Sequence, residues 1–475
     1  MSLITNTSTI RLTIAAACLP LLAACTTFSP DGGFEPVQTA VRERGGTEAR
    51  WVRTDRDAGE VRQTVERLIA KPLTADAAVQ VALINNGGLQ ATYAEVGIAE
   101  ADLVQAGRLR NPGFSYGRLR QGDDIEIERA FLLDVLGLLT IPLRTQIEQR
   151  RFGVMKTRVA AETLRVAADV RRAYYRALAA QEGVKYMQQV KEAAEASAEL
   201  ARRMAAAGNF SRLDQAREQV FYAETTAQLA RVQQAALSER EQLTRMMGLW
   251  GEDIRYRLPE RLPDLPKNAR ELSDVEPAAL KQRLDVQAAM QEAQSIASSL
   301  GLTRATGFVS VLELSYLHNN ESGKPRQTGY EIELSLPIFD WGDARMARAE
   351  YTYMQAVNRA ADSAVRARSE VREAYGAYRT SFDLARHYRD EIVPLRKHIS
   401  DENVLRYNGM LISVFELLAD ARQQVASVNA YIEALRDYWI AEATLQTAMT
   451  GTSPGAIGMA PSGGTQAAAG EAAGH

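Results

Sequence analysis

One succession of predicted elements occurs twice in this chain of 475 residues. Each copy consists of a helix, a β-hairpin, a very long helix, a glycine turn and a second long helix. Pro142 and Pro337, which precede the very long helices, lie about 195 residues apart, and the turn glycines Gly208 and Gly409 lie about 201 residues apart. Because both kinds of landmark keep nearly one spacing, the sequence predicts two halves of similar structure.

Composition marks the boundaries outside the repeat. The stretch 25–72 is rich in Gly, Arg and Asp and is predicted to be an extended tether, whereas the Gly/Ala/Ser-rich end of the chain is predicted to be disordered. The predicted parts are a signal peptide (1–24), the tether (25–72), a first repeat (73–250, hairpin near 112–135), a linker (251–270), a second repeat (271–451, hairpin near 307–337) and the tail (452–475).

The long helices have coiled-coil spacing. Apolar residues from Leu411 to Trp439 follow one another in alternating steps of three and four. This period of about 3.5 residues requires a partner helix to cover the apolar seam. A helix of about 65 residues would extend roughly 100 Å at 1.5 Å per residue. No compact domain requires a helix of that length.

The predicted hairpins alternate apolar residues with carboxylates, although Arg129 interrupts the apolar series. Period-two alternation suits a strand between lipid and water, but a half-buried sheet of a soluble protein alternates identically, so both interpretations stay open. The carboxylates that are candidates for a pore lumen are Glu126, Glu128, Glu313, Glu331 and Glu333. Aromatic residues toward the strand ends suit interfacial girdles: Phe114, Tyr116, Tyr316, Tyr330, and Phe339 or Trp341.

The number of predicted strands says more about a possible membrane barrel than their alternating pattern does. No stretch after the signal reaches the roughly 20 apolar residues of a transmembrane helix, so any membrane spanning is expected from strands. Four strands cannot close a barrel, since the smallest membrane barrels have about eight, and open edges are not tolerated in hydrocarbon. Three chains would supply twelve strands. The carboxylates would then line a water-filled mouth that favours cations.

The N-terminus predicts export and lipidation. Arg11 is followed by an apolar stretch from Leu12 to Leu22, which is typical of a secretory signal. Leu22-Ala23-Ala24-Cys25 resembles the bacterial lipobox, which implies that Cys25 carries the lipid, including a palmitate chain. Several acyl chains hold firmly, at about 0.8 kcal/mol per buried methylene. The alternative is an ordinary signal that is cleaved elsewhere.

Composition excludes several functions. The formal net charge of −3 argues against a nucleic-acid partner, and four histidines and two cysteines leave little material for a metal site. No phosphate-binding glycine loop, nucleophile elbow or paired catalytic carboxylate stands in a suitable context. We therefore expect no enzyme activity, cofactor or bound metal.

Three segments carry a resemblance to a known family. They are 73–86, which looks like the family's opening helix, 334–342, which resembles its strand-to-helix junction, and 392–394 followed by 407–409, which resemble the approach to its periplasmic tip. The chain thus resembles the lipoproteins of the TolC-like outer-membrane efflux protein family over about 73–451. This resemblance implies a mainly α fold with membrane β: a trimeric 12-stranded β-barrel in the outer membrane, continued by a 12-helix α-barrel tunnel across the periplasm.

The resemblance also implies an entrance at the tip, narrowed by acidic residues and held partly by polar links between neighbouring helices. Arg212 and Asp214 stand at this place in the first half. In the second half, one extra residue after Gly409 would place Glu416 there, whereas a gapless match would place Phe415, and Asp420 lies nearby. Routine helix-start and surface charges are the alternative. The expected adaptor-contact residues are Gly208, Asn209, Asn408 and Gly409.

The function implied is passive transport through the outer membrane. Such a homotrimer would receive substrates from an inner-membrane pump through a periplasmic adaptor, a membrane fusion protein, while anchored in outer-membrane lipid. A lipid-anchored periplasmic coiled-coil adaptor, or an envelope scaffold without a pore, is the alternative.

Overall fold

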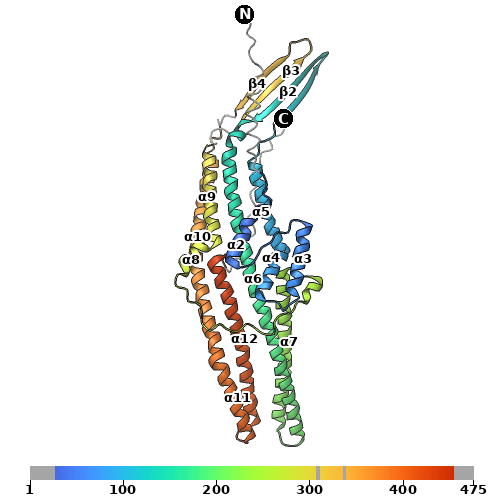
Figure 1. Cartoon of the computed structure of the whole chain (residues 1–475), viewed down its shortest axis with the longest axis vertical. Helices are drawn as coiled ribbons and strands as arrows, with labels where there is room; N and C mark the ends of the chain where they lie inside the picture. The colour runs from blue at the N-terminus through green and yellow to red at the C-terminus, as the bar shows by residue number, and fades with distance from the viewer. Residues whose placement is uncertain (1–26, 306–310, 335–338, 454–475) are drawn as a thin grey trace. The chain divides into compact units, whose positions relative to one another are not determined.

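The computed structural model describes residues 27–305, 311–334 and 339–453, except for the side chains of Ala305, Val414 and Phe415 (Figure 1). The chain forms two compact units. The first combines the described residues up to Val61 with Asn86–Thr163 and Leu284–Ala364. The second combines Arg62–Asn85, Leu164–Arg283 and the described residues from Val365 onward. Helices α3, α6 and α10 each contribute residues to both units.

The described elements are mostly long helices. In chain order they are α2 (Glu35–Gly45), α3 (Asp55–Ile69), α4 (Ala75–Asn85), α5 (Gly87–Ala106), β1 (Gly113–Gln121), β2 (Asp124–Asp134), α6 (Val135–Ala206), α7 (Arg212–Met247), the 3₁₀ helix η1 (Gly251–Arg255), α8 (Val275–Gln282), α9 (Leu284–Ala305), β3 (Leu312–Glu321), β4 (Gln327–Leu334), α10 (Asp343–His387), the π-helical segment η2 (Tyr388–Ile392), α11 (Val393–Asn408) and α12 (Val414–Thr450). None of these helices has the length and apolar character required to cross a bilayer.

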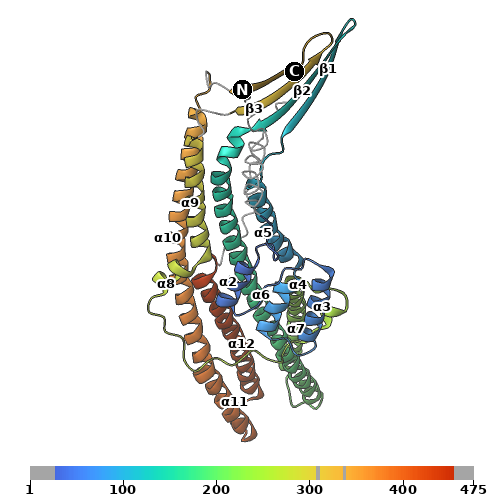
Figure 2. The same cartoon turned by 45° about the horizontal axis from the view of Figure 1, so that its top comes forward.

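The first unit contains one antiparallel sheet in the order β1-β2-β3-β4 (Figure 2). Each hairpin pairs neighbours in sequence, and β2 pairs with β3, so the two hairpins form one surface. Strand β2 runs directly into α6, because the Asp134 carboxylate accepts a hydrogen bond from the Gly137 amide at 2.6 Å. The prediction that Pro142 opens this helix is therefore wrong by about two turns: Pro142 lies inside α6.

The prediction of an extended tether over 25–72 is wrong for its described part, which contains the whole of α2 and α3. Phe34 is buried and packs edge-on against Tyr93 of α5, with ring centroids 4.7 Å apart. Gly97 of α5 leaves room for Trp51, since a Cβ there would come within 2.7 Å of the indole ring. Although this segment is rich in Gly and Asp, a few of its apolar residues, such as Phe34 and Trp51, pack against α5, which follows later in the sequence.

The single helix predicted at the start of the first repeat is two helices, α4 and α5. Asn86 ends the run, because its side chain accepts a hydrogen bond from the Leu89 amide and caps α5. In the second unit, the neighbouring Asn85 side chain donates to the carbonyls of Met247 and Gly248, at 3.1 and 2.9 Å. The end of α4 is thereby fixed to the end of α7.

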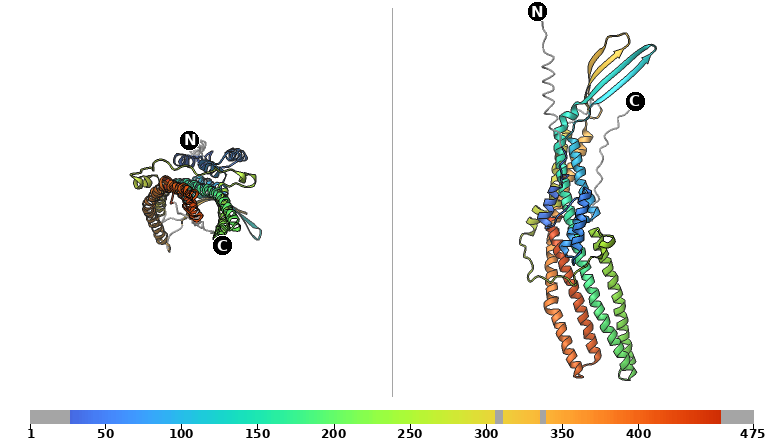
Figure 3. Two further views of the ribbon diagram at one scale, coloured as in Figure 1. Left: turned by 90° about the horizontal axis from the view of Figure 1, so that it is seen from below. Right: turned by 45° about the vertical axis from the view of Figure 1, so that its right-hand side comes forward.

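The second unit contains two helical hairpins, the C-terminal part of α6 with α7, and α11 with α12. They lie side by side, in green and in orange to red (Figures 1 and 3). Pro394 stands in the first turn of α11, directly after the π-helical segment η2. A proline removes one backbone donor, and a widened turn accommodates this within a continuous helical path.

A buried ion pair joins three elements of the second unit. Arg283, between α8 and α9, is only 1% exposed, and its guanidinium lies 2.9 Å from the Glu370 carboxylate of α10. The same guanidinium donates to the Ala448 carbonyl of α12 at 3.4 Å. A buried charge of this kind is tolerated only when it is paired and hydrogen-bonded.

Candidate functional site

The sheet register places all five predicted lumen carboxylates on one face. Directly opposite residues of antiparallel strands point to the same side. Glu313 lies opposite both Asp134 and Glu333, and Ser315 lies opposite Glu331. Glu126 and Glu128 have the same parity along β2 as Asp134. One side of the sheet is therefore predominantly acidic.

The other side of the sheet is mainly apolar and carries a row of four aromatic residues, although Arg118, Arg120 and Arg129 lie on this side nearer the turn between β1 and β2. The row crosses every strand and consists of Phe114, Phe131, Tyr316 and Tyr330. Each of these residues is more than half exposed in the single chain, and the Phe114 and Phe131 ring centroids lie 5.0 Å apart. A second row of Leu133, Leu314 and Ile332 lies next to it. Exposed apolar rows of this kind mark a surface that meets lipid or a partner.

The outer edges of the sheet are open in the described part of this chain. Strands β1 and β4 each pair with a neighbour on one side only. Unpaired strand edges present a row of free N–H and C=O groups and readily accept another strand. Both outer strands of the described sheet are thus able to pair with a further strand.

The helical hairpin tips turn in the same way in both halves. In the first tip Gly208 is left-handed with φ +80°, and the Asn209 amide donates back to the Met204 carbonyl. In the second tip the left-handed residue is Met410, with φ +61°, and the Leu411 amide donates to the Arg406 carbonyl. Both are Schellman turns.

The predicted correspondence of Gly208 with Gly409 is therefore wrong by one residue. Gly409 has φ −80°, a conformation open to any residue, and Met410 is the counterpart of Gly208. Glycine is the residue that most often adopts the left-handed conformation at a helix end, but at the second tip a methionine adopts it.

Asp214 and Glu416, the acidic residues predicted at the entrance, lie in the first turns of α7 and α12. The Asp214 amide donates to the Ser211 hydroxyl oxygen at 3.1 Å, and Asp214 also pairs with Arg217. In the second half the Glu416 amide donates to the Ser413 hydroxyl oxygen at 3.3 Å, while the Glu416 carboxylate accepts from the Ser413 amide at 3.2 Å. Because each amide donates to the hydroxyl oxygen of a capping serine three residues earlier, Glu416 is the counterpart of Asp214.

One buried carboxylate links three helices near the tips. Glu218 of α7 is 2% exposed. Its oxygens accept from the Ser197 hydroxyl of α6 at 2.9 Å and from the Arg422 guanidinium of α12 at 3.3 Å. The Arg422 guanidinium also lies 4.1 Å from the ring centroid of Phe221. The two helical hairpins are therefore joined by one charged contact.

Solved structures identify the architecture. A membrane protein from Pseudomonas aeruginosa matches with a TM-score of 0.68 and 20% identity, over 81% of this chain and 93% of that chain. The outer-membrane channel OprN matches with a TM-score of 0.66 and 18% identity, over 82% and 92% of the two chains. The MtrE outer membrane channel of Neisseria gonorrhoeae, in its open state, matches with a TM-score of 0.65 and 17% identity, over 79% and 88%. The chain has the fold of the TolC-like outer-membrane channels.

No family model matches the chain, and no curated protein matches it as a sequence relative. At identities of 20% and below, the structural matches establish the TolC-like fold alone. The mainly α fold with a small sheet, which the resemblance implies, is thereby confirmed for the single chain, and the trimeric barrel stays a prediction.

The TolC-like fold brings together some of the predicted site residues and separates others. The five lumen carboxylates share a face, while Arg212 and Asp214 lie in the first turn of α7, and Asn408 ends α11. Arg212, Gly208 and Asn209 are exposed. Cys25 and the side chain of Phe415 lie outside the described residues. Asp420, one helical turn after Glu416, has a buried Oδ2 without a hydrogen-bond partner among the described residues.

The link between Glu218 and Arg422 was missed in the sequence. A signal for Glu218 exists, because the spacing of Asp214 and Glu218 equals that of Glu416 and Asp420. Arg422 has no such counterpart, since Val220 stands at the equivalent place. Among the described residues, no group of His, Cys, Asp or Glu is placed to hold a metal ion.

The two tips should respond in opposite ways to the exchange of glycine and methionine at their left-handed residues, Gly208 and Met410. Gly208→Met should lower the free energy of unfolding of the tip by about 1 kcal/mol, because a side chain is disfavoured at positive φ, and Met410→Gly should raise it by a similar or smaller amount. Gly409→Ala is the matched control and should leave stability unchanged or raise it by up to about 1 kcal/mol, because φ −80° suits alanine. Amide hydrogen exchange of the tips in purified protein measures each change, and a loss at Gly409→Ala equal to that at Gly208→Met would contradict the assignment.

Proposed function

We propose that this chain is the outer-membrane channel of a tripartite export system. Three copies complete one barrel of twelve strands, and their helical hairpins form a tunnel of twelve helices in the periplasm. The observation that carries this proposal is the described sheet, which is predominantly acidic on one face, mainly apolar and aromatic on the other, and open at both edges. Three sheets joined edge to edge satisfy the open strands, direct the apolar rows to lipid and enclose the carboxylates in water.

The channel is passive and takes its substrates from an inner-membrane pump through a periplasmic adaptor. Lipid attached to Cys25 anchors each chain in the outer membrane. The adaptor binds the tips at Gly208, Asn209, Asn408 and Gly409. The entrance lies at the same end, where the contact of Glu218 with Arg422 holds two helical hairpins together. Docking of the adaptor separates the hairpins and opens the entrance.

Reconstitution of the acylated full chain tests the proposal. The purified protein should be a trimer by native mass spectrometry and should give stepwise conductance in planar bilayers. A monomer that produces no conductance would contradict the proposal and favour an adaptor or a scaffold. Measurements at matched protein concentration with and without a purified adaptor then test the opening step.

The acidic face predicts the ion preference of the channel. The unmodified channel should favour cations, and Glu313→Gln with Glu333→Gln should lower the ratio of cation to anion permeability about sevenfold. A change of the local potential by roughly 1 kT per unit charge alters the local cation and anion concentrations about threefold each, in opposite directions. Reversal potentials in a tenfold KCl gradient measure this ratio. Glu43→Gln with Glu66→Gln removes two charges from exposed positions of α2 and α3 and should leave it unchanged. Anion preference in the unmodified channel would overturn this assignment.

A further inference from the structure

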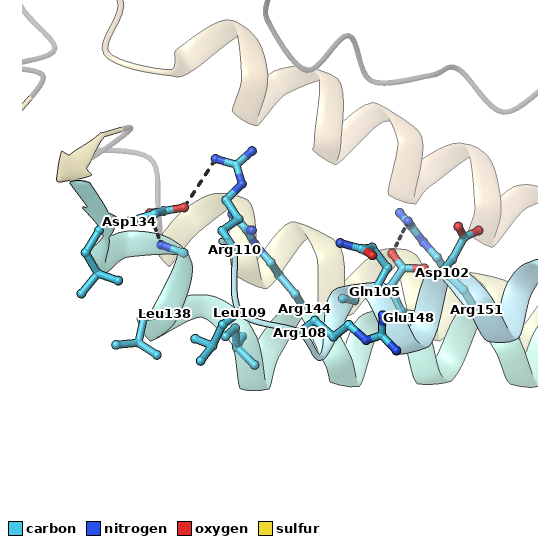
Figure 4. A pocket seen from close by; sticks show the side chains of 14 residues that line it. Asp102, Gln105, Arg108, Leu109, Arg110, Asp134, Leu138, Arg144, Glu148 and Arg151 are labelled. Atoms are coloured by element: carbon cyan, nitrogen blue, oxygen red, sulfur yellow. Dashed lines mark hydrogen bonds and ion pairs between the residues drawn. The ribbon is translucent and has the colours of Figure 1, made fainter. Parts of the chain in front are cut away.

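A cavity of about 390 Å³ lies between the end of α5 and the beginning of α6, beside the start of the sheet (Figure 4). The cavity belongs entirely to the first unit. Its lining includes four arginines and three carboxylates, so its charged side chains carry a net positive charge. The arginines are Arg108, Arg110, Arg144 and Arg151.

Two of the four arginines are paired within the chain and two are not. Arg110 contacts Asp134 at 3.5 Å, and Arg151 contacts Glu148 at 2.6 Å. The side chains of both arginines are more than half exposed, so these ion pairs are weak and open to competition. Arg108 and Arg144 form no ion pair with any described residue, and both are exposed. The cavity therefore offers guanidinium donors to an anion from outside the chain.

Apolar side chains accompany this positive charge. Leu109, Leu133 and Leu138 line the same cavity, and Figure 4 shows Leu109 and Leu138 together on the side away from Arg110 and Asp134. Leu139, in the next position of α6, is 68% exposed. Leu133 belongs to the apolar face of the sheet, so that face continues to the rim of the cavity. A ligand that fits both parts has an anionic head and an apolar body.

Ser29, four residues after Cys25, is fixed to α5. The Ser29 amide donates to the Glu100 carboxylate of α5 at 2.8 Å. The four residues from Ser29 back to Cys25 can reach at most about 14 Å. From Glu100 to the end of α5 at Ala106 is about 9 Å along the helix, and Arg108 follows directly. Acyl chains on Cys25 and a lipid in the cavity can thus enter the same leaflet.

We propose that this cavity binds the phosphate-bearing head group of an anionic phospholipid from the periplasm-facing leaflet. The inference rests on the proposed membrane position of the sheet. Arg108 and Arg144 donate to the phosphate oxygens, Arg110 and Arg151 add positive charge, and the acyl chains run along the exposed leucines. Guanidinium groups suit this role because they donate several hydrogen bonds in a fixed plane and remain charged.

Lipid retention on the full-length acylated trimer tests the site. Trimers from mixed micelles containing phosphatidylglycerol or phosphatidylcholine are compared by native mass spectrometry. The unmodified trimer should retain phosphatidylglycerol in preference to phosphatidylcholine. Arg108→Gln with Arg144→Gln should weaken that retention about fivefold for each arginine removed. Arg231→Gln with Arg359→Gln, which removes two exposed arginines elsewhere, is the control and should leave retention unchanged.

Equal retention of the two lipids, or equal loss in the control and the cavity variant, would overturn the proposal. Saturation by inorganic phosphate at millimolar concentration, without preference for phosphatidylglycerol, would assign a free-anion site and also overturn it. The conductance of the same samples separates this result from the proposed function. A conducting trimer without lipid preference refutes only the lipid site, whereas a protein that never inserts refutes the channel.

Discussion

Leu314→Arg should prevent the assembled protein from inserting into a bilayer, whereas Glu313→Arg should not. The two residues are neighbours on β3, and their side chains lie on opposite faces of the sheet. An arginine on the lipid-facing side of a barrel costs about 2–4 kcal/mol at the bilayer centre and about 0–1 kcal/mol near the interface. Leu314 lies opposite Leu133 at the rim of the cavity, so its cost is intermediate, and the trimer multiplies it by three. An arginine on the water-filled side remains solvated and changes only the local charge.

The measurement is the fraction of protein in liposomes after flotation, followed by single-channel recording of the inserted fraction. Glu313→Arg should insert at the unmodified level and lose cation preference. A leucine-to-arginine control in the helical tip, at the exposed Leu213, separates a membrane effect from a general loss of solubility. Equal insertion of the Leu314 and Glu313 variants would show that the sheet does not face lipid on its apolar side.

Arg422→Ala should open the tip in the absence of an adaptor. The substitution leaves Glu218 buried without its cation, and an unsatisfied buried group of this kind costs about 1–3 kcal/mol. The helical hairpin of α11 and α12 is then free to move from that of α6 and α7. Single-channel recording should show a larger resting conductance, and thermal unfolding should begin at a lower temperature.

Two further variants isolate the contact from general destabilisation. Glu218→Gln keeps an acceptor for the Ser197 hydroxyl and removes the charge, so it should raise the resting conductance with a smaller loss of stability. The double variant Glu218→Gln with Arg422→Ala should show less than the sum of the two single effects, since both single substitutions remove the same interaction. Arg202→Ala removes an exposed ion pair within α6 and should leave the conductance unchanged. A folded Arg422→Ala trimer with unmodified resting conductance would refute a gating role for this contact.

Periodicity along the chain predicted the features that depend on local geometry. Alternation of apolar residues with Glu126, Glu128, Glu331 and Glu333 was sufficient to assign the acidic face, because successive side chains of a strand point to opposite sides whatever the strand pairs with. The order of helices and hairpins could likewise be predicted, since helical spacing and turn residues are properties of short segments.

The tertiary structure decided the features that depend on distant partners. Three features are not encoded in any local pattern: the pairing of β2 with β3, the packing of Phe34 and Trp51 against α5, and the contact of Glu218 with Arg422 across 204 residues. The left-handed conformation of Met410 is a similar case, because the turn that joins two packed helices imposes it on a residue that does not favour it. Local sterics thus determined the elements, and long-range packing determined which of their side chains meet.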